Sequence, residues 1–199
     1  MAHNLTDVRE YIPHDLIGLT SVTPKQFERI CRKYPDLRLE LTSSGELIIM
    51  PPAGYLSGVR NANLTYQLMA WTKKDGSGVC VDSSAGFALP NGATRAPDAA
   101  WIRRDKVGHL TKEEQERFGP FCPDFVVEVS SPSDSVTQLR DKMLEYIENG
   151  ASLGRLIDPF QRRVYIYRPH EELLILENPE TVSGEPLLPG FTLNVTELW

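Results

Sequence analysis

Cysteine is scarce in this chain, and the pattern of the few that occur excludes two kinds of structure. The 199 residues include three cysteines, Cys31, Cys80 and Cys122, which are odd in number and far apart. A disulfide framework needs paired cysteines, and a thiolate metal site needs cysteines at close spacing. We therefore expect neither, and a reducing cytoplasm is the predicted compartment.

Long hydrophobic runs are missing as well. No apolar run approaches the ~20 residues that cross a membrane, and the start, Met1-Ala2-His3-Asn4, lacks the basic and apolar segments of a secretory signal. We expect no membrane partner. Hydrophobic residues make up 41% and charged residues 24% of the chain, which excludes disorder and coiled coil. The length predicts one domain over residues 1–199, with its core at about 37–170.

Positive charge is in short supply. The formal net charge is -6, which argues against avid nonspecific binding of nucleic acid, because such binding depends on a basic surface. An enzyme that contacts nucleic acid locally is still compatible, since a metal-binding carboxylate cluster is itself negative. The four histidines lack zinc-ligand spacing, and the motifs of P-loop NTPases, dinucleotide enzymes and serine hydrolases are absent.

The first third of the chain predicts two helices and a hairpin. Thr23-Pro24-Lys25-Gln26 matches a capping box and predicts a helix to about Lys33. Residues 37–41 and 46–50 are apolar segments around a Ser-Ser-Gly turn, which predicts a β-hairpin. A second helix is expected over residues 56–73, and its apolar stripe consists of Val59, Leu64, Leu68 and Trp71.

The rest of the chain predicts strands around one further helix. Strands are expected at residues 79–87, 98–102, 125–129, 155–157 and 163–167, and the tail is rich in turns. Ser131-Pro132-Ser133-Asp134 predicts the start of a helix, with a serine as its cap, and Asn149-Gly150 predicts its end. The expected fold class is α/β, a mixed central sheet flanked by helices, with an N-terminal hairpin extension.

Glu128 is the most informative residue, because it interrupts the apolar strand 125–129. A buried carboxylate is costly unless a cation meets it. Asp98 has a similar setting, after Pro97 and before Ala-Ala-Trp-Ile. Two acids on neighbouring strands can converge on a hard divalent cation, and oxygen ligands suit Mg²⁺ or Mn²⁺.

Lys142 is the predicted cation. It shares a helix flank with Gln138 and Tyr146, at intervals of four residues. If this helix packs on the sheet, the ammonium reaches the two carboxylates, where it orients a water and offsets charge on a phosphate.

The motifs together resemble a known family, the Uma-type endonucleases of the restriction-endonuclease-like PD-(D/E)XK superfamily. The resemblance covers most of the chain. It rests on Ala96-Pro97-Asp98-Ala99-Ala100-Trp101, Cys122-Pro123-Asp124 with the strand that follows, Lys142-Met143-Leu144-Glu145-Tyr146, Leu156-Ile157-Asp158-Pro159, and the hairpin that ends at Met50-Pro51-Pro52.

The resemblance implies an αβββαβ-type core and Mg²⁺-dependent phosphodiester hydrolysis, with Mn²⁺ as a substitute. Asp98, Glu128 and the Val129 carbonyl would hold the metal, and Asp98, Glu128 and Lys142 would be catalytic. Two positions depart from the family pattern. Ser130 stands where the superfamily has its lysine, whose role would pass to Lys142, and Ser57 stands where relatives often have histidine.

Pro123-Asp124 competes with Pro97-Asp98 for the acidic role. Asp124 lies four residues before Glu128, roughly 13 Å along a strand at ~3.3 Å per residue, which is too far for both to hold one ion. We therefore favour Asp98 and interpret Asp124 as a turn residue at the start of the strand.

Each candidate taken alone has a purely structural interpretation. Glu128 could pair with Arg140 or Arg155, Lys142 could be solvated, and Tyr146 could only pack. Glu40 is expected to be an exposed hairpin acid, and the alternative is a position near the metal. The charged segment 103–106 is expected to be a solvated loop, although it is the best local candidate for phosphate contact.

The leading hypothesis is a metal-dependent endonuclease with DNA as its substrate, which works as a homodimer if both strands are cut. The alternative is a catalytically inactive binding module on the same fold, which the acidic charge and Ser130 favour. A third hypothesis is a hydrolase of small phosphodiesters, with a pocket too narrow for a duplex.

Overall fold

A six-stranded mixed sheet forms the centre of the protein in the computed structural model, which describes residues 12–16, 19 and 21–199. In spatial order the strands are β10 (Leu174–Glu177), β9 (Arg163–Tyr167), β8 (Leu153–Asp158), β7 (Phe125–Val129), β6 (Ala99–Arg103) and β3 (Gly78–Asp82). Strands β7 and β8 are parallel, and the other neighbours are antiparallel. The mixed α/β class is therefore confirmed.

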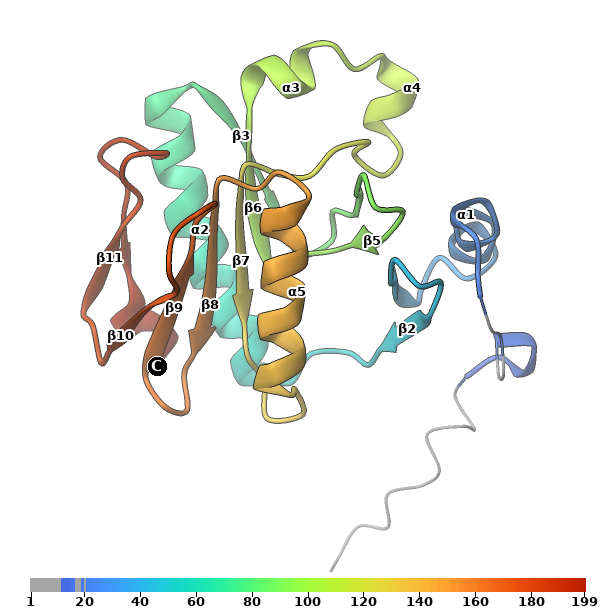
Figure 1. The fold of residues 1–199 in the computed structure, drawn as a ribbon, viewed down its shortest axis with the longest axis horizontal. Coiled ribbons are helices and arrows are strands. Elements are labelled where there is room, and N and C mark those ends of the chain that lie inside the picture. Colours follow the sequence, from blue (N-terminus) through green and yellow to red (C-terminus); the bar gives the residue numbers. More distant parts are fainter. Residues whose placement is uncertain (1–11, 17–18, 20) are drawn as a thin grey trace, which may run out of the picture.

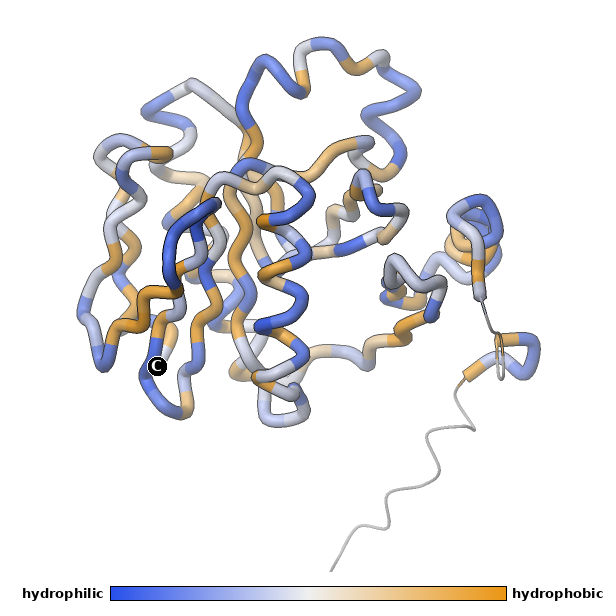
Figure 2. The backbone as a smooth tube through the Cα atoms, in the orientation of Figure 1, coloured by the Kyte–Doolittle hydropathy of each residue, from blue (hydrophilic) through white to orange (hydrophobic). Residues whose placement is uncertain are grey.

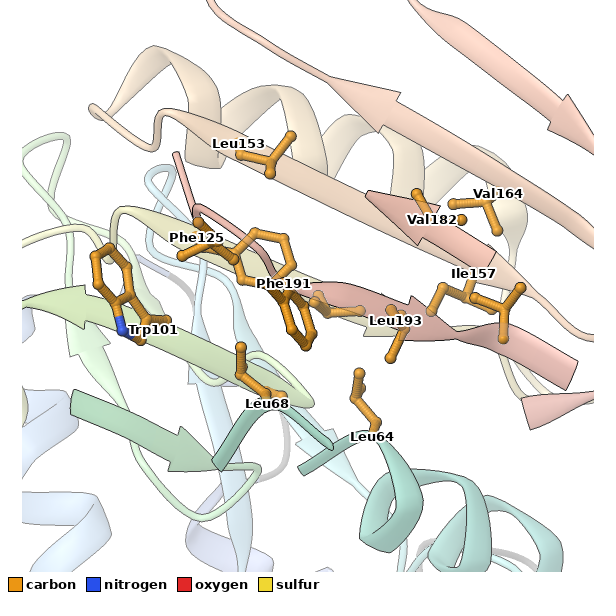
Figure 3. Close-up of a cluster of buried hydrophobic side chains, with 14 of the residues drawn as sticks. Leu64, Leu68, Trp101, Phe125, Leu153, Ile157, Val164, Val182, Phe191 and Leu193 are labelled. Atoms are coloured by element: carbon orange, nitrogen blue, oxygen red, sulfur yellow. The ribbon is translucent and has the colours of Figure 1, made fainter. Parts of the chain in front are cut away.

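One long helix covers each face of this sheet (Figure 1). Alternate residues of a strand point to opposite faces, and β7 is apolar on both. Helix α2 (Tyr55–Asp75) packs Leu64 and Leu68 on the face that bears Phe125 and Val127, together with the C-terminal segments (Figure 3). Helix α5 (Val136–Glu148) packs on the opposite face. The order α2, β3, β6, β7, α5, β8 matches the implied αβββαβ core.

The predicted hairpin belongs to a second, smaller sheet beside the central one (Figure 1). Its order is β2 (Leu47–Met50), β1 (Arg38–Leu41), β5 (Thr94–Arg95) and β4 (Phe87–Ala88). Helix α1 (Pro24–Lys33) begins with the predicted capping box and packs Phe27 against Leu41. Because β1 pairs with β5 through Leu41 and Thr94, the hairpin is tied to the segment that leads into β6.

Several boundaries differ from the predictions. Helix α5 begins after Ser135, because the Asp134 side chain accepts the Ser131 amide and closes a turn over the predicted start. Strand β3 ends at Asp82, since Ser84 hydrogen-bonds back to the Asp82 side chain. Val59 is exposed and lies outside the buried stripe of α2.

The remaining elements are short. They are η2 (His14–Leu16), α3 (Arg104–Gly108), α4 (Lys112–Gln115), β11 (Thr181–Ser183), β12 (Thr192–Asn194) and η3 (Val195–Leu198). The segment of α3 and α4 is largely hydrophilic, whereas β7 is largely hydrophobic (Figure 2). In the part of the chain that the structure describes, no helix has the length and apolar character needed to cross a membrane.

Candidate active site

Asp98 and Glu128 meet across two neighbouring strands. Strands β6 and β7 are antiparallel, with Ala99 opposite Val127. Asp98 directly precedes Ala99, and Glu128 directly follows Val127, so both acids lie just beyond this last printed pair. The Asp98 carboxylate accepts the N–H of Val129, the residue after Glu128. This contact brings the two acids together at the end of β7.

Asp98 is held by neutral donors. The Asn61 amide donates to one carboxylate oxygen at 2.7 Å, and the Val129 N–H donates to the other at 2.8 Å. Burial raises the pKa of Asp98, although its side chain is still partly exposed. Sequence reasoning missed Asn61. Its only signal is its position one helical turn after Ser57, on the core-facing side of α2.

The Val129 carbonyl points to the same place. In an antiparallel pair the N–H and C=O of one residue face the same neighbouring strand. Since the Val129 N–H reaches Asp98, the Val129 oxygen faces that side too.

Glu128 is 4% exposed and receives two partners from α5. Lys142 Nζ lies 2.7 Å from Glu128 Oε1, and the Tyr146 hydroxyl donates to the same oxygen at 3.1 Å. The cation beside Glu128 is thus Lys142 and neither Arg140 nor Arg155, so the arginine alternative is wrong. Burial raises the pKa of Glu128 to about 8, although Lys142 opposes the shift. Burial likewise raises the pKa of Tyr146.

Glu40 corrects an expectation, because it is 2% exposed instead of lying in solvent. Its Oε1 contacts Lys142 Nζ at 2.8 Å and accepts the Ala96 N–H at 2.9 Å, while Oε2 contacts Arg95 at 3.1 Å. Burial alone would raise the pKa of Glu40, but these partners, Lys142 first, hold it below its usual value.

Lys142 is therefore shared between two carboxylates. Burial would lower the pKa of its amine, but Glu128 and Glu40 keep it above the ordinary value. The purely structural alternative of a solvated lysine is wrong, since the Lys142 side chain is 12% exposed. At neutral pH this side chain is a cation and a hydrogen-bond donor.

The charges of the cluster suit a divalent cation. Four carboxylates face two cations, a net charge of -2 when all are ionised; they are Glu40, Asp98, Glu128 and Glu145 against Lys142 and Arg95. Within residues 12–16, 19 and 21–199, no group of three or more His, Cys, Asp or Glu side chains is arranged to hold a metal. Mg²⁺ typically uses one or two carboxylates and completes its shell with water and substrate phosphate. The oxygen donors of Asp98, Glu128 and Val129 therefore fit Mg²⁺ or Mn²⁺.

Asp124 lies at the opposite end of β7, as interpreted from the sequence. Its carboxylate accepts the Arg103 N–H at 2.9 Å and contacts Lys106 at 3.0 Å. The segment 103–106 is thus at this end, and phosphate contact by it at the Glu128 end is not supported. Ser130 directly follows β7 and is buried, and its N–H donates a hydrogen bond to the Ile157 carbonyl. Ser57 lies in the first turn of α2.

The fold defines the class of protein first. A crystal structure described as that of a putative nuclease from Anabaena variabilis superposes with a TM-score of 0.74 and 18% identity, over 89% of this chain and 97% of that one. The chain therefore shares the α/β fold of that protein. The model of the Uma2 family, described as "Putative restriction endonuclease", matches residues 24–196, and the chain belongs to this family. No curated protein matches it.

Proposed function

We propose that this protein is a Mg²⁺-dependent endonuclease that hydrolyses phosphodiester bonds in DNA. Two contacts carry this proposal: the Asp98 carboxylate accepts the N–H of Val129, next to Glu128, at 2.8 Å, and Lys142 Nζ lies 2.7 Å from Glu128. Membership of a family described as restriction endonucleases supports nucleic acid as the substrate. Helices α2 and α5 both begin at one end of the sheet (Figure 1).

Asp98, Glu128 and the Val129 carbonyl would hold the Mg²⁺ ion, and Mn²⁺ would substitute. Bound there, the ion would supply Lewis-acid activation of water and of the phosphodiester. Both carboxylates must be deprotonated to bind it, and their raised pKa values make the proton a competitor.

The chain's own residues would orient the two carboxylates and stabilise the charge on the phosphate. Asn61 and the Val129 N–H hold the Asp98 carboxylate in one orientation, and Tyr146 does the same for Glu128. Lys142 is cationic at neutral pH, so it acts as a hydrogen-bond donor to water and offsets the negative charge that develops on the phosphate. It does not act as a base.

Cleavage of supercoiled plasmid and of labelled oligonucleotides with Mg²⁺ or Mn²⁺ tests this function. We expect nicking that EDTA abolishes, and a loss of about 100-fold or more in Lys142→Met, because one preorganised charge at the reacting phosphate is typically worth that much. Lys106→Met is the matched control, since Lys106 pairs with Asp124 at the far end of β7. Nicking that survives in Lys142→Met would show that another site, or a contaminant, is responsible.

The same assays separate the alternatives. A binding module without activity predicts no cleavage of DNA or RNA and no Mn²⁺ binding by calorimetry at millimolar metal. A hydrolase of small phosphodiesters predicts turnover of a bis-ester dye with no nicking. If the protein is a nuclease that cuts both strands as a homodimer, light scattering should give about twice the mass of one chain.

A further inference from the structure

We propose that Arg95 is a positioning residue for Lys142 and acts on it through Glu40. This inference rests on the proposed function, because it assigns Lys142 its orientation at that site. Arg95 belongs to β5, outside the segments that carry the acid pair and the lysine.

Four side chains form a ring that consists of three ion pairs and one turn of helix α5. Arg95 contacts Glu145 through Nε at 2.6 Å and Glu40 through Nη1 at 3.1 Å. Glu40 contacts Lys142 at 2.8 Å. Lys142 and Glu145 lie one turn apart on α5, so the helix closes the ring. Asn91 adds a hydrogen bond to the other Glu145 oxygen at 2.9 Å.

Arg95 changes how Lys142 is shared between two carboxylates. The ammonium lies 2.8 Å from Glu40 and 2.7 Å from Glu128. Without Arg95, Glu40 would be a buried carboxylate with Lys142 as its one remaining cationic contact among the described residues. Its attraction for Lys142 would rise, since Coulomb attraction between buried groups is weakly screened. Arg95 neutralises part of the Glu40 charge and so leaves Lys142 directed at Glu128.

Only arginine suits this position. The Arg95 side chain is 9% exposed and offers two nitrogens to two carboxylates from different elements. A guanidinium has a rigid fork of donors, whereas an ammonium is a point charge that cannot make the same two contacts from the same place. The ring also makes the small sheet part of the site, because Glu40 lies on β1 and Arg95 on β5.

Kinetics of Arg95→Met and Arg95→Lys test the positioning role. We expect kcat to fall about 10- to 100-fold in Arg95→Met, the usual cost of losing a residue that orients an active-site group, with KM within about twofold. Arg95→Lys should lose less than Arg95→Met. In a Lys142→Met background, Arg95→Met should add less than about twofold, because both changes then act on the same group.

Mn²⁺ affinity, measured by calorimetry, distinguishes the positioning role from a merely structural one. A structural role would lower this affinity together with kcat, whereas the positioning role raises it. Arg95→Met removes one positive charge from the cluster. If Lys142 also shifts from Glu128 to Glu40, Glu128 loses its ion pair and is available to the metal. Arg95→Met should then bind Mn²⁺ about three- to tenfold more tightly while kcat falls. Arg155→Met is the matched control: Arg155 is also buried, but it packs on Phe125 and Phe191, on the opposite sheet face. It should change Mn²⁺ affinity by less than about twofold.

The outcomes separate this inference from the proposed function. If the wild-type protein cleaves and Arg95→Met keeps its kcat, the positioning role is wrong and the function stands. A joint fall in kcat and Mn²⁺ affinity would show a structural role and also overturn the inference. If the wild-type protein does not cleave, the function fails, and an unchanged Mn²⁺ affinity in Arg95→Met overturns the inference as well.

Discussion

Pro97-Asp98 and Pro123-Asp124 each lead directly into a strand of the central sheet, and their aspartates have opposite surroundings. Asp124, at the start of β7, is buried and meets the cations Arg103 and Lys106. Asp98, just before β6, meets the neutral donors Asn61 and the Val129 amide. Asp124 thus has cations in direct contact, whereas the hydrogen-bond partners of Asp98 are neutral. The comparison teaches that the contacting partners, and not the dipeptide, distinguish the carboxylate that we propose as a metal ligand from the one that is paired within the fold.

The largest expected effect comes from the same substitution at both positions. Asp98→Asn should lower Mg²⁺-dependent cleavage by about 1,000-fold, since it removes a proposed metal ligand, whereas Asp124→Asn should change it by less than about threefold. Rates are compared in plasmid nicking at saturating metal, after circular dichroism shows that both variants are folded. Equal losses in the two variants would contradict the contrast between the two ends.

The second effect is the pH dependence of stability in EDTA. The pKa of Glu128 is raised from 4.5 to about 8, so the folded protein binds this proton more tightly than the unfolded chain does. The stability that this proton provides is fully present below pH 4.5 and is lost as the pH rises to about 8. Tm in EDTA should therefore fall over this window.

Glu128→Gln is the control for that window. It keeps an acceptor for Lys142 and Tyr146 but cannot ionise, so the fall in Tm should be smaller in this variant. Excess Mn²⁺ should raise the Tm of the wild-type protein most at alkaline pH, and that of Glu128→Gln much less. Parallel Tm curves for the two proteins would place the titrating group elsewhere.

The smallest effect is the structural cost of Asp124→Asn. This change breaks a buried carboxylate's contacts with Arg103 and Lys106, whose side chains are 52% and 33% exposed and can turn to water. The Asn oxygen still accepts the Arg103 N–H, so a loss of about 1–2 kcal/mol in unfolding free energy is expected. Urea denaturation measures it. No loss would mean that this end is not held by Asp124.

Local patterns predicted most of the elements and the first half of the site. The alternation of β7 put Glu128 on the face that α5 covers, and the spacing in α5 put Lys142 beside Tyr146. These predictions needed only strand and helix periodicity, which depends on neighbouring residues. The boundary of α5 was predicted too early because Asp134 forms a side-chain turn that competes with the helix.

The ring around Lys142 was not predictable in the same way. Glu40 alternates with the apolar residues Leu39 and Leu41, as an exposed hairpin residue would. It is buried because β1 pairs with β5 at Leu41 and Thr94. Arg95 contacts Glu40 from 55 residues away and had no signal of its own. Asn61 likewise resembles any polar helix residue until α2 lies beside β6.

The amino-acid order alone determined the apolar strand with its single acid, the helix with its lysine flank, and the charge types available to a site, because these depend on covalent neighbours and short-range periodicity. The tertiary structure decided which of two aspartates has only neutral hydrogen-bond partners, and that one ammonium is shared between two carboxylates. Those outcomes depend on strand register and on packing between distant segments, which set distances and burial that no local pattern contains.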